Sequence, residues 1–147
     1  MGVKERLDAG EYLEQAFMID RLIKAKVTQI QELRDMCESL GGIRTDTKVQ
    51  TSLKLDPLGD AVTSMMDSIL YEEKEIARLI DVKKEIAAVI SSVERDDYRL
   101  ILYERYVNMK KWEEIAVDSG YSERHVKRLH GMALKKICPF MSRKNFV

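Results

Sequence analysis

The sequence predicts an all-α protein, in which a long helical hairpin of coiled-coil type over residues 1–95 precedes a helix-turn-helix domain over residues 96–147. The composition is the first reason, because two prolines in 147 residues and an abundance of Leu, Ile, Lys and Glu favour helices. The second reason is that apolar residues recur at helical spacing over long stretches bounded by Gly and Pro. The third is a short C-terminal segment with the residues of a helix-turn-helix.

The first helix is predicted over residues 5–40, which contain no proline. Gly41-Gly42 is expected to end it, because glycine disfavours helix continuation. Residues 41–56 are polar and are predicted to form a loop longer than most helix–helix connections. The apolar positions of the helix follow spacings of three, four and occasionally six: Leu13, Phe17, Ile23, Val27, Ile30, Leu33, Cys37 and Leu40.

A second long helix is predicted to begin at Asp56-Pro57, where Asp56 caps it and Pro57 occupies its first turn. A heptad follows, and Glu72 and Lys83 are its polar interruptions. Two interpretations remain open: the seam packs on the first helix of the same chain, or it joins two chains, and both can hold together. The ten seam positions are Val62, Met65, Ile69, Glu72, Ile76, Leu79, Lys83, Ile86, Ile90 and Val93.

A third, short helix is predicted from Asp97 to about Val107. Asp96 is its expected cap and Asn108 its expected stop. The side chains expected to face inward are Leu100, Ile101, Tyr103 and Val107.

Residues 112–129 match a helix-turn-helix position by position. Ala116 is small enough for two helices that cross steeply, and Gly120 tolerates the positive φ of a tight turn. Ser122 is a preferred N-cap for the second helix, whereas Lys111 is a poor cap for the first. The shared core is predicted from four apolar residues: Ile115, Tyr121, Val126 and Leu129.

The second helix of this motif has two chemically distinct faces, and Cys138-Pro139 ends it. Val126, Leu129, Ala133 and Ile137 fall within an arc of about 80°. Arg124, Lys127, Arg128, Gly131 and Lys135 fall opposite, which favours the major groove of duplex DNA. The alternative is a helical hairpin whose polar face is merely solvated. The predicted DNA-binding residues are Lys110, Lys111, Ser122, Arg124, His125, Lys127, Arg128 and Lys135.

The charge distribution agrees with a polyanionic partner for the C-terminal part. Residues 98–147 carry eleven Lys and Arg against five Asp and Glu, whereas residues 1–97 carry fourteen against twenty.

The segment from about Tyr98 to Lys136 resembles region four of sigma factors, which recognises a promoter element. The resemblance is carried by Leu102-Tyr103-Glu104-Arg105-Tyr106, Trp112-Glu113-Glu114-Ile115-Ala116 and Tyr121-Ser122-Glu123-Arg124-His125-Val126. The whole chain resembles phage-encoded late transcriptional regulators of the ArpU/RinA-like group. Since the promoter-melting regions of a sigma factor are missing, the resemblance implies a regulator that works with host RNA polymerase.

Several classes of protein are not expected. His125 and His130 lack metal-ligand spacing, and there is no glycine-rich phosphate loop, so we expect no enzyme, metal or cofactor. Two isolated cysteines, Cys37 and Cys138, and the lack of a membrane span or signal peptide favour the cytoplasm. We expect double-stranded DNA as a partner and self-association through the N-terminal helices. Two alternatives remain: a small-terminase-like DNA-packaging subunit, and a module that binds RNA polymerase without DNA.

Overall fold

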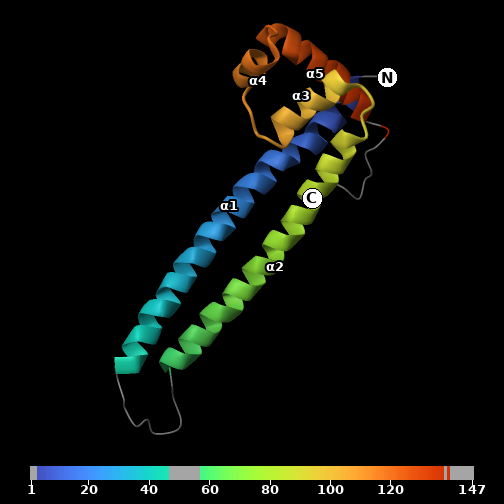
Figure 1. Cartoon of the computed structure of the whole chain (residues 1–147). Helices are drawn as coiled ribbons and strands as arrows, with labels where there is room; N and C mark the ends of the chain where they lie inside the picture. Colours follow the sequence, from blue (N-terminus) through green and yellow to red (C-terminus); the bar gives the residue numbers. More distant parts are fainter. Residues whose placement is uncertain (1–2, 47–56, 138, 140–147) are drawn as a thin grey trace. The chain divides into compact units, whose positions relative to one another are not determined.

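The computed structural model describes residues 3–137 and 139, apart from 47–56, and these residues form five α-helices and no β-strand (Figure 1). The predicted all-α class is therefore confirmed. The helices are α1 (Val3–Asp46), α2 (Pro57–Ser91), α3 (Asp96–Tyr106), α4 (Trp112–Ser119) and α5 (Glu123–Ile137).

The chain divides into two compact units, and both long helices contribute to each. The two-helix unit comprises Leu22–Leu79, and the five-helix unit comprises Met1–Arg21 together with Ile80–Val147. The domain boundary that the sequence predicts at residue 95 stays a prediction.

In the two-helix unit, α1 and α2 pack side by side and run antiparallel. The Lys26 ammonium donates a 2.6 Å hydrogen bond to the Glu72 carboxylate, and Cys37 Sγ lies 3.8 Å from Met65 Sδ. Higher residue numbers on α1 thus face lower residue numbers on α2, as in any antiparallel pair of helices. Glu72, an apparent interruption of the predicted seam, is the partner of a cation on the facing helix. The seam therefore contacts the first helix of the same chain in this unit.

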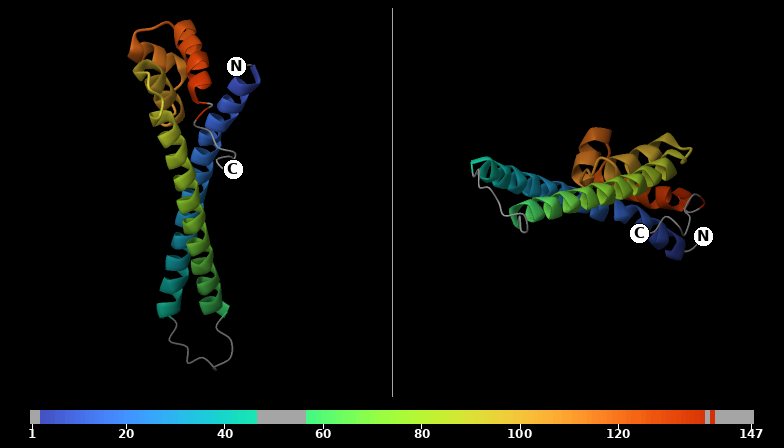
Figure 2. Two further views of the ribbon diagram at one scale, coloured as in Figure 1. Left: turned by 90° about the vertical axis from the view of Figure 1, so that its right-hand side faces the viewer. Right: turned by 90° about the horizontal axis from the view of Figure 1, so that it is seen from below.

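In the five-helix unit, α3, α4 and α5 pack against one another beside the first turns of α1 (Figures 1 and 2). Lys83, the second interruption of the seam, pairs with Asp20 on α1 at 3.2 Å. All five helices contribute to the core, α4 through Ile115. The largest fully buried side chains of the core include Tyr12, Leu13, Ile19, Ile86, Ile90, Leu102, Val126 and Ile137.

The predicted helix stop at Gly41-Gly42 is wrong, because α1 continues through both glycines to Asp46. Each glycine costs about 1 kcal/mol relative to alanine inside a helix. A helix that is already nucleated and tens of residues long can bear this cost, since elongation adds one hydrogen bond per residue. Most of the predicted loop, residues 47–56, and the predicted cap Asp56 lie outside the described residues, whereas Pro57 is the first residue of α2 as expected.

The predicted inward face of α3 is also largely wrong. Ile101 is buried as expected, but Leu100 is 57% exposed and Tyr103 is 38% exposed. The helix instead buries Tyr98, Leu102 and Tyr106, the face that meets α1 and α5. Both faces carry apolar residues, so the neighbouring helices decide which face is covered.

Asp96 does not cap α3. It is the first helical residue and pairs with Arg99, while Arg95 occupies the N-cap position without a side-chain cap.

Candidate nucleic-acid interface

The connection between α4 and α5 has the tight geometry expected from its sequence. Gly120 adopts the left-handed conformation with φ of 75°, and its N–H donates to the Ala116 carbonyl at 3.0 Å. A side chain at this position would strain the backbone, because only glycine visits this region freely. The two helices are therefore joined by a defined turn.

Ser122 directly precedes α5 and caps it, as predicted. Its hydroxyl accepts the backbone N–H of His125 at 3.1 Å, and its carbonyl accepts the N–H of Val126 at 3.0 Å. This cap satisfies one of the backbone donors that every helix start leaves unpaired. The hydroxyl thus supports the helix that presents the cationic side chains.

The start of α4 compensates for its poor cap. Lys111 occupies the N-cap position, and a lysine side chain has no acceptor to offer the helix. Glu114 reaches back instead and accepts the Lys111 backbone N–H at 3.3 Å. This bond supplies one half of a capping box and places a negative charge at the positive end of the helix.

The two faces of α5 are separated as the sequence predicts. Val126, Leu129, Ala133 and Ile137 are buried, none of them more than 4% exposed, and they pack into the core of the five-helix unit. The side chains of Arg124, Lys127 and Arg128 are exposed on the first turns.

Two of the three exposed cations have partners on their own helix. Lys127 pairs with Glu123 at 3.0 Å, and Arg128 Nη2 lies 3.2 Å from Nδ1 of His125. Because a guanidinium can only donate, the His125 nitrogen is the acceptor of this bond. Arg124 forms no ion pair with any side chain in the described ranges. Arg124 can therefore contact a ligand without first breaking an ion pair.

The remaining predicted cations occupy different surroundings. Lys110 lies between two carboxylates, Glu104 and Asp118, with Asp118 at 2.9 Å, and hydrogen bonding to them raises the pKa of its ammonium. Lys111 is exposed, and Lys135 is half-buried near the end of α5. The structure thus brings Arg124, His125, Lys127 and Arg128 together at one helix start and holds Lys110 in an ion-pair cluster of its own.

Tyr121 was expected in the shared core, and this prediction is wrong, because its side chain is 45% exposed. Its ring contacts the edge of the His125 imidazole, with 4.7 Å between ring centres. The tyrosine directly follows Gly120, the left-handed residue of the turn between α4 and α5.

A half-buried histidine, His130, has a packing role that was not predicted from the sequence. His130 Nε2 lies 2.7 Å from the Tyr106 hydroxyl, and the ring makes an edge contact with Trp112 at 4.7 Å. Burial, with a contribution from the nearby Arg105, lowers the pKa of His130 to about 4. Burial also raises the pKa of the Tyr106 hydroxyl. The signal was available, because residue 130 lies four positions after Val126 and three before Ala133, at the edge of the buried arc.

Comparison with family models, curated proteins and solved structures finds no match to this chain. Within the described part of the chain, no cluster of three or more His, Cys, Asp or Glu side chains could hold a metal ion. Nor is any helix in those ranges long and apolar enough to cross a membrane.

Proposed function

We propose that this chain binds duplex DNA through α4 and α5, acting as a helix-turn-helix whose second helix, α5, enters the major groove. The separation of the two faces of α5 carries the proposal. One face is buried in the core, while Arg124, Lys127 and Arg128 are exposed at the helix start. A helix that served packing alone needs the first face but gains nothing from the second.

The geometry of the helix start suits a groove. Recognition helices of this class contact base edges with their first turns. A guanidinium at such a position can pair with guanine through two hydrogen bonds, and Arg124 is exposed without an ion pair there. It is therefore our candidate for base recognition.

Lys127 and Arg128 are candidates for phosphate contacts. An exposed ion pair such as Lys127–Glu123 contributes about 0.2–1 kcal/mol, so its lysine can be transferred to a phosphate at little cost. Lys110 is a weaker candidate than the sequence indicates, because leaving Glu104 and Asp118 costs two ion pairs. Lys111 and Lys135 remain candidates at the flanks.

As a biological role we propose a transcriptional regulator, encoded by a phage or prophage, that acts with host RNA polymerase. The resemblance to sigma-factor region four and to ArpU/RinA-like regulators supports this role. A pull-down of purified polymerase with the full chain, with and without promoter DNA, tests it. Retention of polymerase is expected, and its absence in both conditions would leave DNA binding as the only proposed activity.

We also propose self-association through the two-helix unit. Six large apolar side chains of this unit are between 39% and 61% exposed: Leu22, Val27, Met36, Met66, Leu70 and Tyr71. Two helices alone cannot cover one another on every side, and a second copy offers the complementary apolar surface.

The decisive experiment compares DNA affinities of variants on a duplex selected from a random library. Arg124→Ala should weaken specific binding by about 1–3 kcal/mol and relax base preference at one or two positions. Lys135→Ala should weaken all sequences alike and lower the salt slope by about one unit. Lys84→Ala, which removes an exposed lysine from α2, is the matched control and should bind normally. Wild-type affinity of both Arg124→Ala and Lys127→Ala would show that α5 is not the recognition helix.

A further inference from the structure

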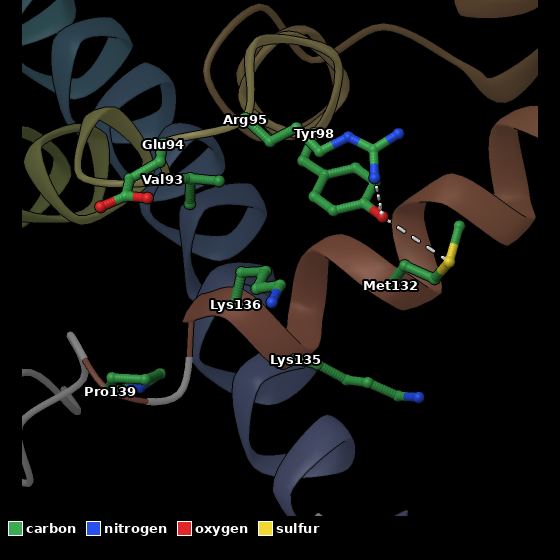
Figure 3. Close-up of a pocket in the computed structure, with 8 residues that line it drawn as sticks. All are labelled: Val93, Glu94, Arg95, Tyr98, Met132, Lys135, Lys136 and Pro139. Carbon is green, nitrogen blue, oxygen red and sulfur yellow. Dashed lines mark hydrogen bonds between the residues drawn. The ribbon is translucent and has the colours of Figure 1, made fainter.

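A hollow of about 700 Å³ opens in the five-helix unit between the start of α3 and the end of α5 (Figure 3). Its walls include four largely apolar side chains: Val93, Tyr98, Met132 and Pro139. Val93 and Tyr98 are nearly fully buried, so the floor of the hollow is part of the packed core. The volume falls within the range of about 300–1,000 Å³ that is usual for small-molecule sites.

The hollow is positively charged. Arg95, Lys135 and Lys136 line it, against the single carboxylate of Glu94. Figure 3 shows both lysines on α5 and Arg95 on the segment before α3, with the Lys135 side chain extending away from the other labelled residues. Arg95 is held by Asp97 at 2.9 Å, whereas Lys135 and Lys136 form no ion pair with a described side chain. The charge that would complement this lining is negative.

The Tyr98 hydroxyl supplies a polar group at the floor. It accepts a 2.9 Å hydrogen bond from Arg95 Nη1, and its own proton is directed to the Met132 sulfur at 3.6 Å. A thioether is a weak acceptor, so an anionic oxygen would be a better partner for this proton. The apolar walls thus suit the apolar body of a ligand, and the cationic rim suits an anionic group on the same molecule.

We propose that this hollow binds a small organic anion with an apolar body, of the aryl or alkyl carboxylate or sulfonate class. Because Lys135 also belongs to the cationic face of α5, the bound anion competes with DNA phosphate for this lysine. That second part rests on the proposed DNA binding. Occupancy of the hollow would then lower the affinity of the chain for DNA.

The binding test uses anilinonaphthalene sulfonate, a fluorescent probe with an aromatic body and one negative charge, on the full chain. One saturable site is expected. The double variant Lys135→Gln/Lys136→Gln should weaken binding of the probe about two- to fivefold, which corresponds to the free energy of partly exposed ion pairs. Lys127→Gln removes one positive charge from another part of α5 and should leave the affinity for the probe unchanged.

The uncharged analogue N-phenylnaphthylamine separates the anion from its apolar body. The uncharged analogue should bind to the wild type more weakly than the sulfonate does. Its affinity should be the same for the wild type and for the double variant. Equal affinity of both probes for the wild type, or no saturable binding at all, would overturn the site.

The regulatory part is tested by titrating the sulfonate into the DNA complex. The apparent Kd for DNA should rise at saturating probe. An unchanged Kd would overturn the competition, whereas a chain that binds the probe but never binds DNA would instead refute the proposed function.

Discussion

The hydroxyl of Tyr106 lies 2.7 Å from Nε2 of His130, at the point where α3, α4 and α5 meet. Trp112 covers the imidazole with an edge contact, and the Arg105 guanidinium lies 4.5 Å from the centre of the Trp112 ring. A protonated imidazole here would face a cation with no carboxylate to balance it among the groups that contact the ring. The five-helix unit is therefore built around a neutral histidine.

This relationship predicts a loss of stability in mild acid. The pKa of His130 is about 4 in the folded chain and 6.5 in the unfolded chain, so the unfolded state takes up the proton first. The contribution of the neutral imidazole is complete above pH 6.5 and is lost as the pH falls from 6.5 to 4. The loss amounts to roughly 3 kcal/mol in the free energy of unfolding.

Urea unfolding followed by fluorescence of Trp112, the only tryptophan, measures this loss near the histidine itself. His130→Gln keeps a polar group but cannot titrate, so its stability should fall less between neutral pH and about pH 4.5. If wild type and variant lose the same free energy over that interval, carboxylates and not His130 cause the acid sensitivity.

Two glycines of the candidate interface should respond to alanine with opposite signs. Gly120→Ala should destabilise the five-helix unit by about 1–2 kcal/mol, because its φ of 75° is strained for any residue with a Cβ. No atom beyond the adjoining residues lies within 4 Å of the added carbon, so backbone strain is the whole effect. Gly131→Ala meets open space inside α5 and should stabilise the helix by about 0.5–1 kcal/mol. Urea midpoints that shift in the same direction for both variants would contradict the assigned turn.

The partly buried ion pair of the two-helix unit should couple its two residues. Glu72→Ala leaves the Lys26 ammonium without its carboxylate and should cost about 1–3 kcal/mol. The double variant Lys26→Met/Glu72→Leu should recover most of that loss, because apolar pairs often replace such ion pairs without penalty. Glu73→Ala, which breaks the more exposed pair with Arg34, is the control and should cost at most about 1 kcal/mol. Thermal unfolding by circular dichroism would disprove the coupling if the double variant were as unstable as Glu72→Ala.

Self-association should depend on the exposed apolar side chains of α2. Met66 and Leu70 lie one turn apart, and each is more than half exposed. Met66→Glu/Leu70→Glu should shift the full chain toward the monomer in sedimentation-velocity runs, because charge opposes burial of this surface. Ser64→Glu/Ser68→Glu introduces the same charges at exposed positions one turn apart on the same helix and should leave the distribution unchanged. A strict monomer of the wild type at high concentration would remove the self-association proposal. A ring of eight or more copies would favour the packaging-subunit alternative.

The local elements of the C-terminal part could be determined from sequence alone. The bounds of α4 and α5 follow from signals a few residues apart: a glycine at the turn, Ser122 at the helix start and Pro139 beyond its end. The buried arc of Val126, Leu129, Ala133 and Ile137 was equally predictable, since these apolar residues repeat at one helical spacing, whereas the burial of Leu134 was not predicted.

Tertiary structure alone decided where the sequence offers two equivalent choices or a partner far along the chain. The helix α3 carries apolar residues on both faces, and only the position of its neighbours buries Tyr98 and Tyr106 instead of Leu100. Glu72 interrupts a heptad in the sequence and becomes a cross-helix ion pair only when Lys26, 46 residues away, faces it. His130 is an ordinary polar residue by sequence, and the convergence of three helices makes it a neutral, half-buried one. Capping and periodicity act within one helical turn, whereas burial and charge pairing depend on contacts between segments that no local pattern specifies.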